Sequence, residues 1–215
     1  MDKETSQPSE DPLAPYRAAV RNHGSGFGAT LWASERWQRV RFDVLIDMVG
    51  EASLRDATVL DLGCGDGAFA KRLLDRSIKV SRYIGIDGLF EQVEAGQARS
   101  LPRTSFVCAD LLDATTSLGR FGGDVAFLSG TLNTMSQETA IEFIQGVFAS
   151  VSTAVALNFL SNKPTQDRQD APLGPARRHD VATWIEAGLA MTPLVAYRQD
   201  HLEGHDGALL LRKET

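Results

Sequence analysis

Short apolar runs alternate with segments of helical periodicity along most of the 215-residue chain. The apolar runs that predict strands cover 57–62, 83–87, 105–109, 124–128 and 154–159. Apolar residues at helical spacing predict helices over 68–75, 89–99, 139–150 and 179–189. Near-continuous apolar strands that alternate with helices are typical of a parallel sheet with helices on both faces. The pattern therefore predicts an α/β fold.

The end of the chain has a different pattern. Two apolar runs, 194–197 and 208–212, are separated by a turn and not by a helix. Strands joined in this way pair antiparallel, because a parallel connection needs a long crossover. The sequence thus predicts seven strands, mostly parallel, with an antiparallel last strand.

The region before the first strand is helical. Apolar residues recur at helical spacing over 30–49, and a shorter helix is expected over 15–22. The glycine-rich segment 23–28 predicts a flexible turn between them. Polar and acidic residues dominate before both helices. We therefore expect a disordered tail over 1–12, an N-terminal helical cap or lid over 13–52, and a main domain over 53–215.

The first predicted strand runs directly into a glycine turn. Residues 59–67 read Val-Leu-Asp-Leu-Gly-Cys-Gly-Asp-Gly, and a helix follows. Glycines let the backbone turn tightly and let a ligand approach without an intervening Cβ. Asp87 ends the next strand, 20 residues after Gly67, where an acidic side chain can reach ribose hydroxyls. Together these features predict a site for a nucleoside cofactor.

Two cofactor classes compete for this turn. Gly63, Gly65 and Ala68 satisfy the dinucleotide pattern G-x-G-x-x-A, in which a helix N-terminus holds a pyrophosphate. However, Asp61 precedes the turn and Asp66 lies inside it, and both carboxylates would repel a pyrophosphate. They are suited to the ammonium group of S-adenosylmethionine, which carries no phosphate. The electrostatics favour S-adenosylmethionine.

The motifs together resemble the class I S-adenosylmethionine-dependent methyltransferases. The similarity rests on Asp-Leu-Gly-Cys-Gly-Asp-Gly at 61–67, Gly-Ile-Asp at 85–87 and Cys-Ala-Asp-Leu at 108–111. It covers about residues 55–215, and the antiparallel end fits the seventh strand of that family. It implies a Rossmann-like sheet. The front region, with Tyr16 and Trp32, resembles the helical cap of some small bacterial members.

The resemblance also implies roles for individual residues. Asp61 and the glycine turn would surround the methionine part of the cofactor, and Asp87 would hold the ribose hydroxyls. Asp110 would lie at the adenine amino group, and Ser129 with Gly130 would lie near the reactive methyl. The cofactor-binding residues expected on this basis are Asp61, Gly63, Cys64, Gly65, Gly67, Asp87, Gly88, Asp110, Leu111, Ser129 and Gly130.

Candidate catalytic residues follow from the expected topology. In open parallel sheets ligands lie beyond the carboxyl ends of the strands, and an antiparallel last strand starts at that same edge. The turn that holds His201 and His205 should therefore project toward the active site, as should Asn158 at the end of the fifth strand. His23, in the glycine-rich linker, is a further candidate. A solvated turn is the simpler interpretation of His201 and His205, and we assign no metal site; His179 is expected at the surface.

Three other features have structural or functional interpretations. Arg17, Arg21, Arg36, Arg39 and Arg41 form a basic run on the front helices. It is interpreted as a solvated helix face, with a clamp for an acidic acceptor or for the cofactor carboxylate as the alternative. Trp32 and Trp37 are interpreted as packing residues, although Trp32 could form part of a lid. The long loop 161–175 and the front helices are hypothesised to close over the cofactor.

Composition and motifs limit the kinds of partner and substrate that we expect for the protein. The formal net charge is −6, which argues against a large nucleic-acid or anionic-membrane partner. The chain lacks the Asn/Asp-Pro-Pro-aromatic motif of enzymes that methylate adenine or glutamine, because Leu-Ser-Gly-Thr follows the fourth strand. Two cysteines, no signal region and no apolar run of membrane-spanning length predict a reduced, cytoplasmic protein. We expect a small-molecule acceptor, methylated on oxygen or nitrogen, and leave the choice of monomer or homodimer open.

Two alternative functions remain at this point. The glycine pattern by itself fits an NAD(P)-dependent oxidoreductase. A non-catalytic partner subunit that keeps the fold would bind cofactor weakly or not at all. Binding of S-adenosylhomocysteine and of NAD(H), measured side by side, separates these functions.

Overall fold

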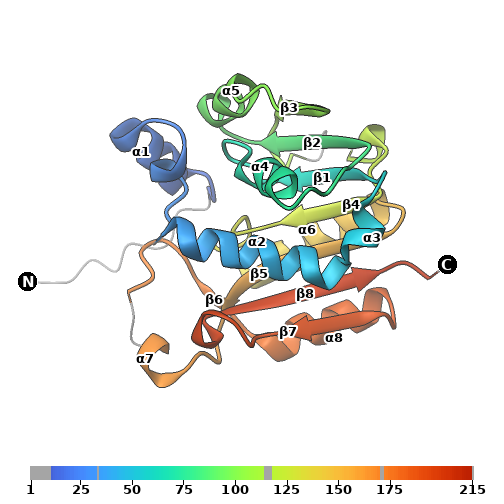
Figure 1. The fold of residues 1–215 in the computed structure, drawn as a ribbon. Coiled ribbons are helices and arrows are strands. Elements are labelled where there is room, and N and C mark those ends of the chain that lie inside the picture. Colours follow the sequence, from blue (N-terminus) through green and yellow to red (C-terminus); the bar gives the residue numbers. More distant parts are fainter. Residues whose placement is uncertain (1–10, 33, 114–117, 170–171, 215) are drawn as a thin grey trace, which may run out of the picture.

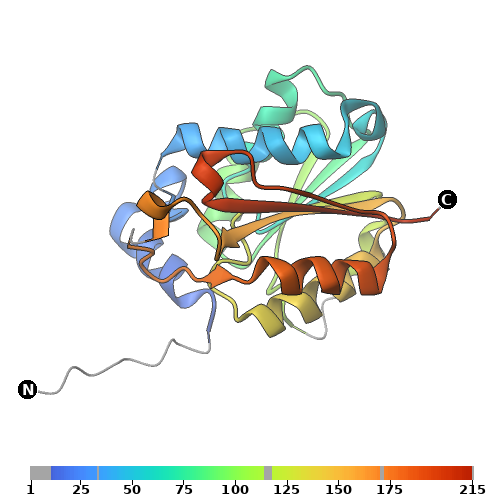
Figure 2. The ribbon, with the colours of Figure 1, turned by 90° about the horizontal axis from the view of Figure 1, so that it is seen from below.

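The computed structural model describes residues 11–32, 34–113, 118–169 and 172–214. Most of the tail expected over 1–12 lies outside this range. The described residues form one eight-stranded sheet with the order β3-β2-β1-β4-β5-β8-β7, and β6 pairs with β5 beside this path. Helices lie on both faces (Figures 1 and 2). The predicted α/β fold with a mostly parallel sheet is confirmed.

The strands match the apolar runs closely. Their bounds are β1 Thr58–Leu62, β2 Arg82–Asp87, β3 Thr104–Cys108, β4 Val125–Leu128, β5 Ala154–Ser161, β6 Arg178–His179, β7 Val195–Arg198 and β8 Asp206–Arg212. Strand β8 runs antiparallel to both β5 and β7, and the other pairs are parallel. The sequence did not predict strand β6, because a strand of two residues shows no hydrophobic periodicity.

Successive residues of the central strands face two separate cores. Val59 of β1 packs with Phe42, while the next residue, Leu60, packs with Ile144 on the opposite face. This alternation is the two-residue period of a strand, and here both faces are apolar because helices cover both. The helices over the first face are α2 Glu35–Val49, α3 Glu51–Leu54, α4 Ala68–Asp75 and α5 Phe90–Ala98, and those over the second are α6 Gln137–Ser150 and α8 Val181–Met191.

The front segment begins with α1 Ala14–His23, which Gly24 ends, and a single 3₁₀ turn, η1 Phe27–Ala29. Helix α2 starts later than the predicted residue 30. Its cap is Ser34, whose hydroxyl accepts a hydrogen bond from the Trp37 backbone N–H at 3.2 Å. A serine cap satisfies one of the free N–H groups of a first helical turn. The remaining short helices are η2 Leu118–Phe121, α7 Gln166–Gln169 and η3 Leu202–Gly204.

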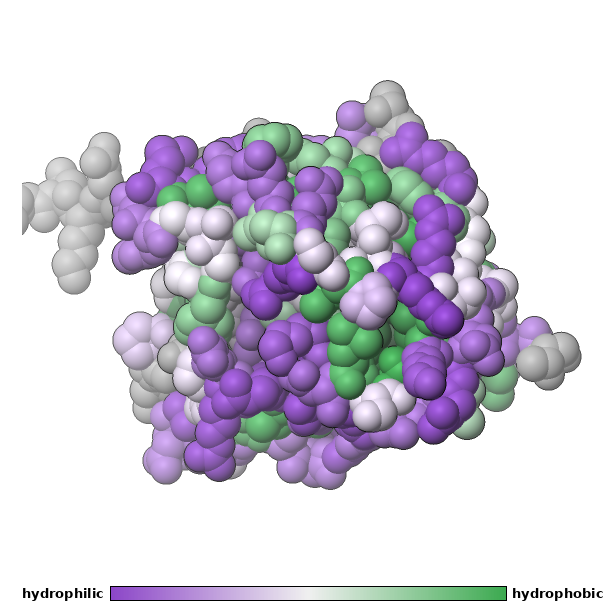
Figure 3. Space-filling model, turned by 45° about the horizontal axis from the view of Figure 1, so that its top comes forward, coloured by the Kyte–Doolittle hydropathy of each residue, from purple (hydrophilic) through white to green (hydrophobic). Residues whose placement is uncertain are grey.

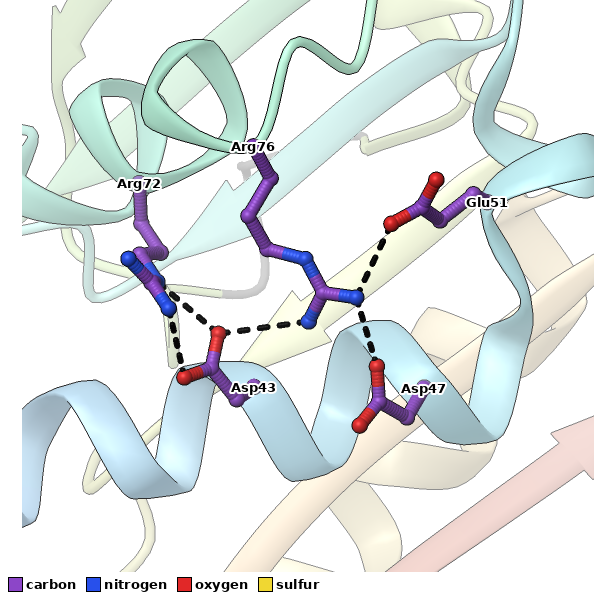
Figure 4. Close-up of polar contacts among 5 residues, drawn as sticks. All are labelled: Asp43, Asp47, Glu51, Arg72 and Arg76. Carbon is purple, nitrogen blue, oxygen red and sulfur yellow. Dashed lines mark hydrogen bonds and ion pairs between the residues drawn. The ribbon is translucent and has the colours of Figure 1, made fainter.

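Charged side chains join α2 to α4. Arg76, the C-cap of α4, lies between Asp43, Asp47 and Glu51, and Arg72 of α4 makes a two-point contact with Asp43 (Figure 4). The pairs are partly exposed, so each contributes about 0.2–1 kcal/mol. The face in Figure 3 is mainly hydrophilic, with small hydrophobic patches between polar side chains. None of the helices in the described part of the chain has the length and apolar character of a membrane span.

Candidate active site

A cavity of about 1050 Å³, open to solvent, lies beyond the carboxyl ends of β1, β2 and β4. Strand β1 pairs with β2 on one side and with β4 on the other, so the chain order reverses at this point. Such a reversal is where open α/β sheets bind ligands. The front segment forms the opposite wall, with α1 beside the strand ends in Figure 1. The lining holds ten of the predicted cofactor-binding residues, namely Asp61, Gly63, Cys64, Gly65, Asp87, Gly88, Asp110, Leu111, Ser129 and Gly130.

The glycine turn is fixed by packing as well as by its backbone angles. Gly63 has a φ of 79°, and a Cβ there would collide with the Thr131 side chain. Gly67 caps α4 with a φ of 76° and does not line the cavity as described. A Cβ on Gly67 would lie 2.6 Å from Cζ of Phe106. Gly67 thus serves the contact between the turn and the sheet, not the cavity surface.

Asp61 is a buried carboxylate at the end of β1. The Tyr83 hydroxyl of the neighbouring strand β2 donates a hydrogen bond to its Oδ2. Burial raises the pKa of Asp61 to about 7, and the hydrogen bond from Tyr83 opposes this rise. A cation placed against Asp61 would restore the charged form, because an opposite charge favours a carboxylate.

Asp87 organises the turn from the end of β2. Its Oδ2 accepts a hydrogen bond from the Gly65 backbone N–H at 2.8 Å, and its Oδ1 accepts one from the Leu89 N–H at 2.9 Å. Burial raises the pKa of Asp87, and these backbone hydrogen bonds oppose the rise. Each carboxylate oxygen has a second lone pair. Asp87 can therefore accept two ribose hydroxyls while it holds the turn.

Two further carboxylates line the cavity. Asp110 follows β3 and its Oδ1 accepts a hydrogen bond from the Leu112 backbone N–H at 3.0 Å. Asp66 forms an ion pair with Arg99, whose Nε also donates to the Asp66 carbonyl oxygen at 2.6 Å. Asp61 near the end of β1, Asp87 at the end of β2 and Asp110 just after β3 thus line one cavity. These three strands are neighbours in the sheet.

Asn158 holds the turn after β4 from behind. Its Oδ1 accepts a hydrogen bond from the Gly130 N–H at 2.9 Å, and its Nδ2 donates to the Ser129 hydroxyl at 3.1 Å. It is 1% exposed and is not among the described lining residues. The structure places Asn158 as a positioning residue for Ser129 and Gly130, whereas the topology suggested a residue in the active site.

His201, His205 and His23 do not line the cavity as the structure describes it. His23 is exposed at the end of α1. His201 and His205 are buried, so the interpretation as a solvated turn is wrong at these two residues. The His205 ring packs edge-on against Trp37, with 5.6 Å between the ring centroids. Burial lowers the pKa of both histidines.

His179 also departs from its prediction. It belongs to strand β6 and is 1% exposed, not at the surface. Its Nδ1 accepts a hydrogen bond from the Trp184 indole N–H at 3.1 Å, and its Nε2 lies 3.2 Å from the Met135 carbonyl oxygen. The sequence placed His179 on the last helix, which in fact begins after it, because Asp180 is the helix cap.

The basic run divides into two groups. Arg17, Arg21, Arg36 and Arg39 are exposed, as a solvated helix face requires. Arg41 is 5% exposed, and its guanidinium makes a two-point ion pair with Asp206 of β8. The same guanidinium lies over the Trp32 ring, 4.2 Å from the ring centroid. The prediction of a solvated face is therefore wrong for Arg41.

Contacts between the front segment and the sheet side position lining residues to which sequence reasoning gave no individual role. Tyr16 donates a hydrogen bond to the Gly130 carbonyl oxygen at 3.3 Å, and Thr134 donates to the Pro12 carbonyl oxygen at 3.0 Å. Gln92 of α5 accepts a hydrogen bond from the Gly26 N–H at 2.9 Å. These contacts join residues 66 or more positions apart, and no local motif marks them. Tyr16 and Trp32 carried a signal, because both belong to the stretch that resembles a helical cap, and Trp32 also follows a flexible turn.

The comparisons with known proteins agree with this geometry. Residues 59–153 match a family model described as a methyltransferase domain. A search among curated proteins finds no match. Among solved structures, magnesium protoporphyrin IX methyltransferase (ChlM) from Synechocystis PCC 6803 with bound SAH is similar, with a TM-score of 0.66, 15% identity, and 93% of each chain covered.

Two further structures show the same fold. An O-methyltransferase family protein from Burkholderia thailandensis has a TM-score of 0.69 and 21% identity, over 96% of this chain and 65% of that one. A DhpI-SAH complex has a TM-score of 0.64 and 17% identity, over 93% of each chain. Identities this low show the fold alone. The match over 59–153 identifies a methyltransferase domain in this chain, and its Rossmann-like fold is that of the S-adenosylmethionine-dependent methyltransferase structures to which it is similar.

Proposed function

We propose that this protein transfers a methyl group from S-adenosylmethionine to oxygen or nitrogen of a small molecule. One observation carries the proposal: Asp61, Asp87 and Asp110, from the ends of three neighbouring strands, line one cavity together with the glycine turn. These carboxylates match a ligand that presents an ammonium, two ribose hydroxyls and an adenine amino group. They are unfavourable for the pyrophosphate of a dinucleotide.

Each carboxylate has a distinct task in this proposal. Asp61 takes the ammonium group, held in place by Tyr83. Asp87 accepts the ribose hydroxyls with the lone pairs that Gly65 and Leu89 leave free. Asp110 and Leu111 hold the adenine. The bound cofactor supplies an electrophilic methyl on a sulfonium, a good leaving group.

Positioning of the acceptor would provide most of the acceleration. Methyl transfer needs the acceptor atom in line with the methyl, and well-oriented reactants gain several kcal/mol of barrier lowering, up to about 7–11 in favourable cases. Burial raises the pKa of Tyr16 to about 12, so its phenolate is not a base at neutral pH. His201, His205 and His23 lie outside the described lining. The geometry supports catalysis by alignment over general-base catalysis by these histidines.

Calorimetric titration tests the cofactor assignment. S-adenosylhomocysteine should bind, and NAD(H) in the same buffer should not. Asp87→Asn should weaken S-adenosylhomocysteine binding at least tenfold, because an amide holds the turn and the ribose less well. Asp75→Asn, a change at a surface ion pair with Lys71, is the matched control and should leave binding unchanged.

Three outcomes would count against the proposal. Tight NAD(H) binding without S-adenosylhomocysteine binding supports the oxidoreductase alternative. Binding of neither ligand supports a partner subunit without catalysis. If binding is seen, labelled S-adenosylmethionine incubated with metabolite fractions should label a small molecule, and label found only in nucleic acid would refute the acceptor class.

A further inference from the structure

The front-segment side chains that lie against Gly130 in the cavity are aromatic. On the proposed function, Ser129 and Gly130 mark the reactive end, and two front-segment side chains lie against Gly130. The Tyr16 hydroxyl donates a hydrogen bond to the Gly130 carbonyl oxygen. The Trp32 ring is so close that a Cβ added to Gly130 would lie 2.5 Å from Cζ2 of Trp32. Phe42 and Gln38 of α2 also line the cavity. Three aromatic rings and a neutral amide thus belong to the lining that an acceptor can contact.

The charges of the lining have one sign. Asp11, Asp61, Asp66, Asp87 and Asp110 line the cavity, and no Lys, Arg or His appears in the lining as far as the structure describes it. Three of the five, Asp61, Asp87 and Asp110, are the carboxylates that the proposed function gives to the cofactor. Asp66 and Asp11 have arginine partners that are not among the described lining residues, so a second anion brought into this space would find no cation in the described lining.

The cations near the cavity already have partners. Arg99 pairs with Asp66, Arg17 with Asp11, and Arg41 with Asp206. Arg41 also lies against a lining residue, since its guanidinium is 4.2 Å from the Trp32 ring centroid. Its two-point contact with Asp206 neutralises it, and Asp206 is fully buried. An anionic acceptor would have to break one of these pairs to gain a cation.

We infer that the methyl acceptor is a neutral or cationic small molecule, an amine or an alcohol next to an apolar or aromatic group, and that carboxylates and phosphates are excluded. This inference rests on the proposed function. Aromatic faces attract cations and pack against apolar groups. An unpaired anion in the partly enclosed cavity would lose hydration and be repelled by the carboxylates.

The reaction balances without a further co-reactant. An ammonium acceptor first releases a proton to water, which frees the nitrogen lone pair. That lone pair, or one on a hydroxyl oxygen, forms the bond to the methyl carbon while the carbon–sulfur bond breaks and its electrons stay on sulfur. A hydroxyl acceptor loses its proton to water in the same process.

Three probes with the same eight-carbon skeleton test the inference: 2-phenylethylamine, 2-phenylethanol and phenylacetate. They are titrated into protein saturated with S-adenosylhomocysteine, and the Trp32 indole resonance is followed by NMR, with assignment by Trp32→Phe. The amine and the alcohol should bind at least tenfold more tightly than phenylacetate. Equal or tighter binding of phenylacetate overturns the inference. So does the absence of any shift of the Trp32 resonance with all three probes.

A lining variant tests whether charge sets this order. Gln38→Lys places a cation in the lining and should raise the affinity for phenylacetate at least tenfold while it lowers that for the amine. Gln145→Lys, the same change at an exposed position of α6, should leave the order unchanged. An unchanged order in Gln38→Lys, in protein whose fold is verified by circular dichroism, contradicts the inference. If Gln38→Lys does not fold, the wild-type titration still decides.

Failure of the proposed function would be visible separately. S-adenosylhomocysteine binding is measured first, and its absence contradicts the cofactor assignment. The probes are then titrated into the unliganded protein. The same order is expected there, because the carboxylates and the aromatic rings belong to the chain itself.

Discussion

At the scale of single residues, Asp61 shows how burial and function oppose each other. The carboxyl is buried at the end of β1, and burial raises its pKa from 3.8 to about 7. Between pH 3.8 and about 7, Asp61 of the unliganded folded protein therefore keeps its proton, whereas Asp61 of the unfolded chain has lost it. Folding stability from this group falls as the pH rises through this window. Tyr83 limits the loss, because its hydrogen bond favours the charged form.

The affinity for S-adenosylhomocysteine should therefore depend on pH. Only the carboxylate form of Asp61 attracts the ligand ammonium, so affinity should rise from about pH 5.5 to about 7.5 and then level off. Calorimetry across this range measures the curve. Asp61→Asn should bind at least tenfold more weakly at pH 8 and lose this dependence; a wild-type curve that is flat from pH 5.5 to 8 would show that Asp61 does not meet the ammonium.

The same substitution should stabilise the unliganded protein at pH 8. The amide that replaces the Asp61 carboxylate keeps an acceptor for the Tyr83 hydroxyl and removes a buried charge, a gain on the order of 2 kcal/mol. Urea unfolding at pH 8 and pH 5 measures it, and the gain should shrink at pH 5, where Asp61 is already protonated. Asp75→Asn serves as the control. If Asp61→Asn is less stable than the wild type at pH 8, the buried Asp61 carboxylate does not destabilise the folded protein, which contradicts the prediction.

At the scale of elements, a buried ion pair joins the front of the molecule to the last strand. Arg41 on α2 contacts Asp206 at the start of β8, and both side chains are almost fully buried. The pair lies between the Trp32 ring and the turn that carries His201 and His205. It explains why His201 and His205 of that turn are buried on the side that faces α2.

Removing one partner of this pair should be costly. Arg41→Met leaves the Asp206 carboxylate buried without its counter-charge, and we expect a loss of about 3–5 kcal/mol in urea unfolding. The double variant Arg41→Met, Asp206→Leu should recover much of this loss. Arg76→Ala, in the partly exposed cluster of Figure 4, should cost only about 0.2–1 kcal/mol per lost pair. Equal costs for Arg41→Met and Arg76→Ala would mean that burial adds nothing.

At the scale of the whole molecule, the front segment and the strand ends enclose one cavity. Residues from 11 to 32 face the glycine turn and the turn after β4 across this space. Leu13 lies so near Gly88 that a Cβ added to Gly88 would be 2.5 Å from Cδ1 of Leu13. The described part of loop 161–175 lies instead near η3, where Arg168 pairs with Glu203. The lid hypothesis is therefore supported more for the front segment than for this loop.

Limited proteolysis should distinguish the two segments. S-adenosylhomocysteine fills the space under the front segment, so it should slow tryptic cleavage after Arg17 and Arg21, both exposed, by several fold. Cleavage after Arg168 should be slowed much less, which makes it the internal control. Equal protection at all three sites would favour closure of both segments. Unchanged cleavage after Arg17 and Arg21 would contradict a lid.

Local patterns determined the sheet and half of the cavity. Apolar runs marked seven of the eight strands, because a buried parallel strand is apolar on both faces. The glycine turn and Asp87 could be found because a sharp turn at a strand end and the acid after it are close in sequence. The family resemblance added Asp110 and Ser129, and both line the cavity.

The rest was decided by contacts between distant parts of the chain. Tyr16, Trp32 and Gln38 form the other wall because α1, η1 and α2 fold back over the strand ends. The sequence indicated a helical cap here, but not which of its side chains reach the cavity. Asn158 supports Ser129, and His201 and His205 are buried beside the Arg41–Asp206 pair. The sequence by itself determined the sheet and the cofactor side, since these depend on short-range periodicity and turn chemistry. Only the tertiary structure decided the acceptor side, because its surface is assembled from segments that meet across the whole molecule.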